Sequence, residues 1–252
     1  MSTLPDLEKE MYRLISAAQE QDIFLRVIGG LAVKVHSPHA SHRSLERKYP
    51  DIDFVTNKTG AKKLVGFLPA MGYTPNKTFN TLSGDRRQLW YDEAQGRQID
   101  VFIGDFTMCH TLPLADRLEV EPLTIPLAEL YLSKAQIVEL NRKDILDLLA
   151  LLLDHEVGPG DKETINSDLI AGLCAKDWGL YTTISMTIQK LRDFLDEGSI
   201  DLEEDKVQTI KRRLIAMEKA MDVAPKTMAW KMRARVGTRV RWYEEVGEVQ
   251  RT

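Results

Sequence analysis

The spacing of apolar residues near the start of the chain is helical. Residues 3–19 place an apolar side chain at every third or fourth position, which predicts a helix with Thr3 as its N-cap and Pro5 in its first turn. The expected buried face comprises Leu7, Met11, Leu14, Ile15 and Ala18.

The pattern then changes to short β-prone runs separated by glycines and polar loops. We expect, in order, a strand at 23–28, a Gly29-Gly30 turn, a short helix stopped by Pro38, a basic loop at 39–50, a strand at 51–56 and a helix from 59 or 60 to 71. Three further β-prone runs at 77–84, 86–93 and 97–104 predict antiparallel hairpins, the last of them an interior strand.

Helical periodicity returns after a proline-containing loop and continues to the end of the chain. The expected helices cover 127–140, 142–157, 163–175, 178–197, 203–221 and 226–245. We therefore predict an α+β protein: a mixed sheet with flanking helices in a domain spanning 1–125, and an all-helical domain spanning 126–252.

Composition favours a globular, cytoplasmic protein. Of the 252 residues, 43% are hydrophobic, which is ample for a core. The longest apolar run, ILDLLALLLD, is interrupted by Asp147 and is too short to span a bilayer, and the N-terminus lacks the basic start of a signal peptide. Cys109 and Cys174 have no metal-ligand spacing and are expected to be reduced thiols.

The net charge is -4, and the charged residues are distributed unevenly along the chain. Residues 206–252 hold 12 Lys and Arg against 5 Asp and Glu, so the C-terminal tail is basic. Such a tail would suit RNA or an acidic partner, but docking against the chain's own acidic part is the favoured alternative.

Two aspartates, Asp51 and Asp53, lie in the β-prone stretch PDIDFVT. Residues i and i+2 of a strand share a face, so the two charges would stand side by side and call for a cation. The alternative is that Asp51 belongs to a solvated turn and Asp53 to an exposed strand edge. This stretch alone favours neither interpretation.

Asp100, in QIDVF, is a third carboxylate in a predicted strand. If strands 51–56 and 97–104 are neighbours, Asp51, Asp53 and Asp100 converge, because side chains paired across strands lie ~5 Å apart. Oxygen ligands of this kind suit Mg²⁺ or Mn²⁺, which leave coordination positions for phosphate oxygens. The Gly29-Gly30 turn at a helix N-terminus suits a phosphate.

Together VIGGLAV, PDIDF and QIDVF resemble the signature of the nucleotidyltransferase superfamily with the DNA polymerase β-like fold. A later stretch, AELYLSKAQIVELNRKDILDLLALL, is similar to the helical segment of the abortive-infection (AbiE-type toxin) group, where a helix lysine precedes an Arg-x-Asp pattern. The resemblance covers about residues 23–157. The remaining residues resemble no family that we can name.

The resemblance implies a role for each matching position. Asp51 and Asp53 would hold the metal that bridges a nucleoside triphosphate, and Asp100 would complete the metal site and help deprotonate the acceptor hydroxyl. The expected nucleotide contacts are Gly29, Gly30, Arg43, Lys134 and Asp144. The implied reaction moves a nucleoside monophosphate from the triphosphate to a hydroxyl of RNA, protein or a small molecule. The alternative is a non-catalytic nucleotide-binding module, such as one component of a toxin-antitoxin system.

The chain departs from the family pattern before Asp51. The stretch HRSLERKYPDID lacks the threonine of the toxin branch, so either Arg43 or Arg47 takes the place of its arginine. Other candidates have ordinary structural explanations: a solvated loop for the three histidines of HSPHASH, solvent exposure for Lys134, the helix surface for Asp147 and Asp154, and the core for Trp230 and Trp242.

Overall fold

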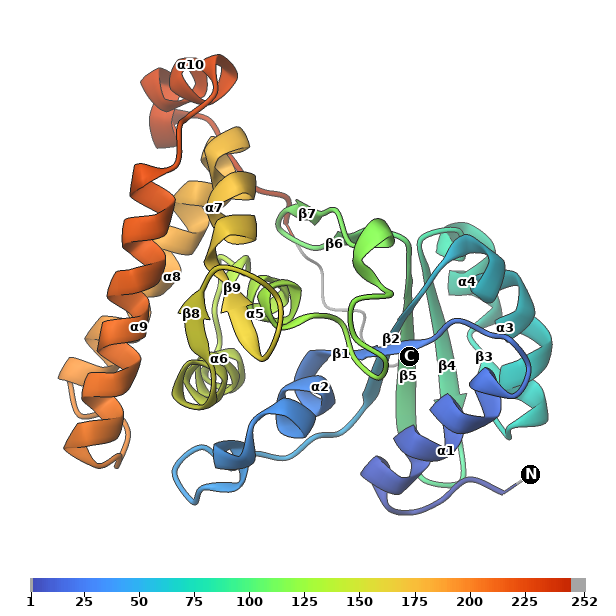
Figure 1. The fold of residues 1–252 in the computed structure, drawn as a ribbon. Helices are drawn as coiled ribbons and strands as arrows, with labels where there is room; N and C mark the ends of the chain where they lie inside the picture. The colour runs from blue at the N-terminus through green and yellow to red at the C-terminus, as the bar shows by residue number, and fades with distance from the viewer. Residues whose placement is uncertain (1, 246–252) are drawn as a thin grey trace. The chain divides into compact units, whose positions relative to one another are not determined.

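The computed structural model describes residues 2–245 of the chain (Figure 1). These residues form two compact units. Of the described residues, unit 1 contains 2–35, 47–106 and 113–126, and unit 2 contains 36–46, 107–112 and 127–245. Each unit is described by itself.

Unit 1 is built on a five-stranded mixed sheet with the order β1-β2-β5-β4-β3. Its central pair, β2 and β5, is parallel, and the other pairs are antiparallel. The strands are β1 (Arg26–Ile28), β2 (Ile52–Thr56), β3 (Thr74–Pro75), β4 (Arg87–Asp92) and β5 (Arg97–Ile103).

The sheet has one apolar face and one face that carries charge. Residues paired across strands share a face, so the register places Val27, Ile52, Phe54, Ile99 and Trp90 together, and all are buried. The opposite face holds Asp53, Asp100 and Arg87 among apolar neighbours such as Leu89. Burying a charge is costly unless it is paired, and Asp100 is paired with Arg87 on this face.

The helices of unit 1 are α1 (Leu7–Gln19), α2 (Gly29–His36), α3 (Lys58–Ala70) and α4 (Lys77–Ser83). Capping side chains fix where several of them begin: Asp6 accepts a hydrogen bond from the amide of Lys9, and Asn57 accepts one from Gly60. The N-cap of α1 is therefore Asp6, and the prediction of Thr3 was wrong.

The expected strand at 77–84 was also wrong, because these residues form α4. Asn76 caps the helix by accepting from the amide of Phe79. Asn80 then exchanges side-chain hydrogen bonds with the backbone of Leu89 in β4, at 2.7 and 3.0 Å. Turn-forming asparagines thus outweigh the β propensity of the run.

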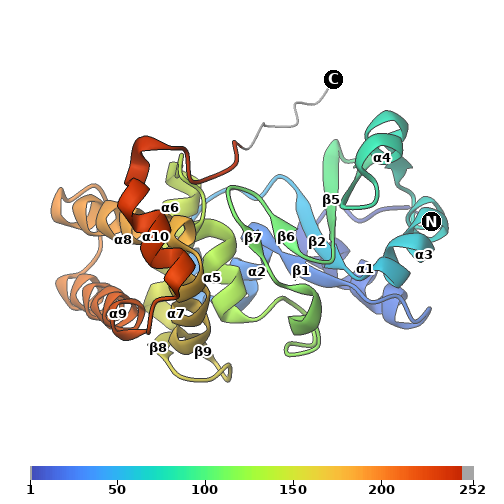
Figure 2. The same ribbon diagram turned by 90° about the horizontal axis from the view of Figure 1, so that it is seen from above.

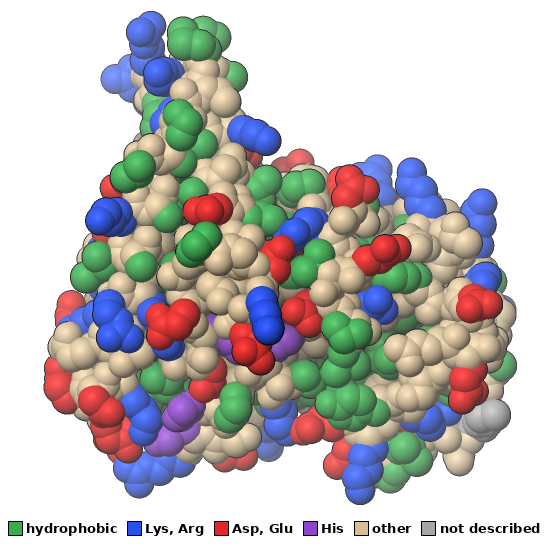
Figure 3. All heavy atoms as spheres, viewed as in Figure 1, with side chains coloured by type: hydrophobic (Ala, Val, Ile, Leu, Met, Phe, Trp, Pro, Cys, Tyr) green, Lys and Arg blue, Asp and Glu red, His purple; other side chains and the backbone are tan. Residues whose placement is uncertain are grey.

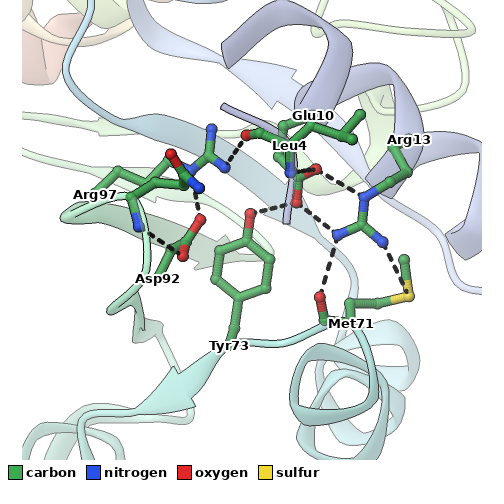
Figure 4. Close-up of polar contacts among 8 residues, drawn as sticks. Leu4, Glu10, Arg13, Met71, Tyr73, Asp92 and Arg97 are labelled. Atoms are coloured by element: carbon green, nitrogen blue, oxygen red, sulfur yellow. Dashed lines mark hydrogen bonds and ion pairs between the residues drawn. The ribbon is translucent and has the colours of Figure 1, made fainter. Parts of the chain in front are cut away.

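A buried polar cluster ties the start of α1 to the sheet (Figure 4). The carboxylate of Glu10 accepts hydrogen bonds from Arg13, from the hydroxyl of Tyr73 at 2.7 Å and from the amide of Leu4 at 3.0 Å. Arg97 pairs with Asp92 at 2.8 Å and donates to the carbonyl of Leu4. Burial raises the pKa of Glu10, but the hydrogen bonds from Arg13, Tyr73 and Leu4 outweigh it and hold that pKa below its ordinary value.

Unit 2 is mainly helical. Its helices are α5 (Leu127–Ala135), α6 (Arg142–Asp154), α7 (Ser167–Lys176), α8 (Trp178–Asp196), α9 (Glu204–Val223) and α10 (Met228–Val236). Figure 2 shows α7, α8 and α9 side by side, in agreement with their mutual packing. The side chains of Asn141, Asn166, Asp177 and Thr227 cap the starts of α6, α7, α8 and α10.

Two details of unit 2 differ from the sequence prediction. Residues 156–158 and 164–166 form a parallel pair, β8 (Glu156–Gly158) and β9 (Thr164–Asn166), so α7 begins at Ser167, where Asn166 caps it. The last helix ends at Val236, because Gly237 follows it with a φ of 60° that stops helical hydrogen bonding. The final part of the predicted helix at 226–245 is therefore not α-helical.

The remaining elements are short: η1 (Pro38–Ser41), β6 (Phe106–Thr107), β7 (Thr111–Leu112), η2 (Ala115–Arg117) and η3 (Gly237–Arg239). The predicted α+β class, with a mixed sheet, flanking helices and a helical part, is confirmed. Cys109 and Cys174 are buried and not disulfide-bonded. None of the helices among the described residues is both long and apolar enough to cross a membrane.

Candidate functional site

Gly29 joins β1 to α2 at a point where the backbone approaches Asp53 closely. Ile28, the residue before it, pairs in register with Asp53, and Gly29 has a φ of 74°, which favours glycine. A Cβ atom at this position would overlap Oδ2 of Asp53. Both the turn and the position of the carboxylate therefore require a residue without a side chain.

Gly30 is the second residue of α2 and is covered by a basic side chain. A Cβ atom on Gly30 would overlap the guanidinium of Arg47 and lie 2.9 Å from Cδ1 of Tyr49. Arg47 stacks over the Tyr49 ring, with 4.2 Å between its Cζ atom and the ring centroid. Of the two arginines that the sequence left open, Arg47 is the one beside the glycine turn.

The three predicted carboxylates lie on neighbouring strands of unit 1. Asp53 and Asp100 are Cα partners in the parallel β2–β5 pair. Asp51 lies just before β2, where its Oδ1 accepts a hydrogen bond from the amide of Gln98 at 3.1 Å. Asp51 and Asp53 are half-buried, and Asp100 is buried. The spacing of PDIDF and QIDVF thus places the three carboxyl-bearing residues in one part of the sheet.

Arg87 adds a cation that the sequence prediction missed. Its Nε donates to Oδ1 of Asp100 at 2.6 Å, and its terminal nitrogen donates to Oδ2 at 2.9 Å. The side chain of Gln98 donates to the same Oδ2 at 3.0 Å. The turn at 94–96 was a usable signal, because a hairpin closed there sets Arg87 diagonally opposite Asp100 across β4 and β5.

The pairing with Asp100 determines the direction in which the pKa of Arg87 is shifted. Burial by itself would lower the pKa of Arg87, but its hydrogen bonds to Asp100 and the charges of Asp100 and Asp53 outweigh that effect and raise the pKa. Arg87 therefore neutralises charge from both in-register carboxylates.

The donor set decides which residues suit a divalent cation. Within residues 2–245, no group of three or more His, Cys, Asp or Glu side chains is placed to hold a metal ion. An ionised carboxylate offers about four lone-pair positions. Asp100 has hydrogen bonds from Arg87 and Gln98 at three of them. Asp51 and Asp53 fit a metal whose other ligands are water and phosphate oxygens.

Unit 2 contains a second charged cluster. Lys134, near the end of α5, pairs with Asp144 at 2.8 Å and with Asp147 at 3.1 Å, both from α6. Asp147 is only 2% exposed, so the expectation of a helix-surface residue was wrong. The lysine does not extend to solvent: its side chain is 16% exposed, because two carboxylates hold it against α6.

Arg43 and the neighbouring histidines also lie in unit 2. Arg43 is 81% exposed and pairs with Asp201. His39 contacts the carboxylate of Asp154 through its backbone amide at 3.0 Å and its Nδ1 at 2.5 Å. His39 therefore has an acidic partner although its side chain is 40% exposed, and Asp154, the half-buried last residue of α6, is the residue that holds it.

The aromatic residues of the C-terminal stretch pack within unit 2. Trp230 contacts the ring of Tyr181, and Trp242 donates from its Nε1 to Thr183 at 3.0 Å. Arg233 donates to the carbonyls of Gly237 and Val240, both at 2.7 Å. This arginine thus secures the turn that ends α10. Residues 246–252 of the basic tail lie outside the described residues.

Comparison with known proteins finds a likeness among solved structures. No family model matches the chain, and no curated protein sequence matches it. The structure is similar to a crystal structure from H. pylori whose assignment as a nucleotidyltransferase is provisional. The two share 15% identity and a TM-score of 0.42, over 85% of this chain and 94% of that one. At this level the likeness assigns neither a family nor a reaction to the chain.

Proposed function

We propose that the protein is a metal-dependent nucleotidyltransferase. It transfers a nucleoside monophosphate from a nucleoside triphosphate to an acceptor hydroxyl. The observation that carries the proposal is the close approach of Gly29 to Asp53, with Asp53 in register with Asp100. This arrangement brings the start of a helix, which attracts phosphate, next to carboxylates that suit a divalent cation.

Each residue of unit 1 has a role in this proposal. Asp51 and Asp53 hold Mg²⁺ or Mn²⁺, which when bound neutralises phosphate charge. The backbone amides at Gly29 and Gly30 bind the triphosphate. Arg47, stacked on Tyr49 over Gly30, adds a positive charge at the same place. Phosphoryl transfer depends mainly on such positioning and charge neutralisation.

Asp100 accepts the proton of the acceptor hydroxyl. Three of its lone-pair positions hold hydrogen bonds, which leaves about one for a hydroxyl. The acceptor oxygen bonds to the α-phosphorus, the bond from that phosphorus to the bridging oxygen breaks, and pyrophosphate leaves. Nucleotide contacts by Arg43, Lys134 and Asp144 stay predictions; Lys134 and Asp144 are paired with each other.

Two measurements test the proposal. Calorimetry with ATP, GTP, CTP and UTP, each with and without Mg²⁺, is expected to show metal-dependent binding of at least one of them. Incubation with the α-³²P-labelled form of that nucleotide and a cell extract is then expected to label RNA, protein or a small molecule. Asp53→Asn is the matched control. Absence of metal-dependent binding to all four nucleotides contradicts the proposal.

A second candidate function is a nucleotide-binding module without turnover, for example one component of a toxin-antitoxin system. The specific observation that favours it is the engagement of both Asp100 oxygens by Arg87. Nucleotide binding with no labelled product, across extract, purified RNA and small hydroxyl compounds, supports this candidate over the enzyme.

RNA is the acceptor that the charge pattern favours. Between residues 224 and 243 the chain has no Asp or Glu, and Lys231, Arg235 and Arg239 are exposed. Basic and hydrophobic side chains gather over α10 in Figure 3. If RNA binds here, its affinity falls steeply with salt, and neutralising these three residues reduces the salt slope. Arg233 is unsuitable for this test because it holds backbone carbonyls.

A further inference from the structure

Arg87 binds Asp100 through two parallel hydrogen bonds, the strongest geometry available between a guanidinium and a carboxylate. The two side chains are 23% and 8% exposed, so solvent screens the pair only in part. The arginine reaches Asp100 from β4, which is hydrogen-bonded to β5 on the side opposite β2. Its guanidinium also lies over the ring of Phe102, with 5.0 Å between Cζ and the ring centroid.

The position of Arg87 is therefore fixed from several directions. The register of β4 and β5 sets its backbone, Phe102 supports one face of the guanidinium, and Asp100 orients its nitrogens. The charges of both Asp100 and Asp53 act on it. A positive charge held in this way serves the same electrostatic purpose as a metal ion shared between two carboxylates.

We propose that Arg87 is a built-in cation at Asp100 and takes the place of a second divalent ion, so that the site holds one divalent cation, at Asp51 and Asp53. The nucleotide part of this inference rests on the proposed function, whereas the cation count does not. Arg87 is a positioning residue: it orients the carboxylate of Asp100 and leaves about one lone-pair position for the acceptor hydroxyl.

The inference makes a specific statement about metal binding. In Arg87→Met the two oxygens of Asp100 lose the guanidinium, and the negative charges of Asp53 and Asp100 are no longer offset by it. Two neighbouring carboxylates attract a divalent ion more strongly when a positive charge beside them is removed. A second cation site therefore opens in the variant.

The experiment counts Mn²⁺ ions bound to the full chain, without nucleotide, by electron paramagnetic resonance of the free ion during a titration. We expect one site in the wild type and two in Arg87→Met. Arg87→Lys keeps the charge but not the two parallel hydrogen bonds, and it is expected to stay at one site. Because Arg87→Lys keeps a positive charge beside Asp100, we expect it to fold even if Arg87→Met does not.

Two control variants test whether the second Mn²⁺ site requires the loss of Arg87 in particular rather than the loss of any arginine. Arg86→Met removes a neighbouring positive charge that is 89% exposed, and it should leave the count at one. Arg97→Met breaks the other buried Arg–Asp pair of the same two strands, with Asp92, and should lower the melting temperature without adding an Mn²⁺ site. A second site in Arg97→Met as well would assign the effect to loosened packing and overturn the inference.

The outcomes distinguish this inference from the proposed function. Two Mn²⁺ sites in the wild type, or the same count in wild type and Arg87→Met, overturn the inference. No Mn²⁺ site in the wild type contradicts the cation at Asp51 and Asp53 and overturns the inference, whatever the count in Arg87→Met. One site rising to two, without nucleotide binding, supports the inference and contradicts the enzyme.

Discussion

Both oxygens of the Asp100 carboxylate accept hydrogen bonds from the guanidinium of Arg87, at 2.6 and 2.9 Å. This pair changes the interpretation of the acidic cluster that the sequence indicates. Three carboxylates on adjacent strands call for a cation, and in this chain the fold supplies one from β4. The divalent ion that we propose then lies at the two half-buried carboxylates, Asp51 and Asp53.

Asp100→Asn is expected to lower both stability and turnover. The substitution leaves Arg87 charged, largely buried and without its anionic partner, so we expect a loss of about 1–3 kcal/mol in the free energy of unfolding. Urea unfolding measures this loss. Arg87→Met/Asp100→Leu removes both charges and should recover part of the stability but no turnover. An unchanged unfolding midpoint in Asp100→Asn contradicts the structural role of the pair.

Asp53→Asn is expected to separate function from stability. Asp53 is half-buried at the glycine turn, and asparagine has nearly the same shape, so the free energy of unfolding should change by less than ~1 kcal/mol. Loss of a ligand at the site of charge neutralisation should lower the rate by at least ~100-fold. Melting temperature and label transfer are measured on the same preparation. Near-normal transfer would mean that Asp53 belongs to an ordinary strand edge.

Sequence pattern predicted the parts of unit 1 whose chemistry is local. The glycine pair predicted the turn before α2, and strand propensity together with the aspartate spacing predicted β2, β5 and the neighbouring carboxylates. These features depend on backbone conformation and on a two-residue period, both of which are visible in a single segment.

Three of the misses share one physical cause, a partner from another segment of the chain. Asp147 was predicted to be a surface residue because Lys134, the cation that pairs with it, comes from another helix. Residues 77–84 read as a strand because the hydrogen bonds of Asn80 to Leu89 come from the fold. Arg87 was missed because its partner lies on the next strand. Such pairings are decided by tertiary structure rather than by local propensity.

Lys134→Met is expected to destabilise the protein through the carboxylates that it leaves behind. Asp144 and Asp147 both lose their cation, and Asp147 is buried, so we expect a loss of about 2–4 kcal/mol. Lys143→Met, on the exposed side of α6, is the control and should change stability by less than ~0.5 kcal/mol. Lys134→Met/Asp147→Asn should be more stable than Lys134→Met. The contribution of Lys134 to nucleotide affinity is therefore measured on the double variant, because the single variant is destabilised. Equal stability of Lys134→Met and wild type contradicts the structural pairing.

Glu10 is expected to make stability depend on acid pH. Hydrogen bonds from Arg13, Tyr73 and the Leu4 amide hold its pKa below the ordinary value of 4.5, even though burial acts in the opposite direction. A carboxyl whose pKa is lower in the folded state stabilises the fold above its unfolded-state pKa, and this contribution disappears as pH falls through the folded-state pKa. Urea unfolding between pH 7 and 3 should therefore show a stability decrease below about pH 4.5 that is smaller in Glu10→Gln. Parallel pH profiles for the two proteins would contradict this role.

Gly29→Ala tests whether the glycine turn and Asp53 form one site. Alanine at a φ of 74° costs about 1 kcal/mol in backbone strain, and its Cβ would also overlap Oδ2 of Asp53. Gly96→Ala is the matched control, because Gly96 has a φ of 63° but has no atom within 4 Å of the added Cβ. Both variants therefore lose stability through strain, but only Gly29→Ala displaces a carboxylate.

We expect Gly29→Ala to lose at least about 1 kcal/mol more than Gly96→Ala in urea unfolding, since relieving the overlap moves either α2 or β2. Calorimetry should show weaker Mg²⁺-dependent nucleotide binding in Gly29→Ala alone. Equal binding in the two variants would separate the glycine turn from the nucleotide site, even if the difference in stability is observed.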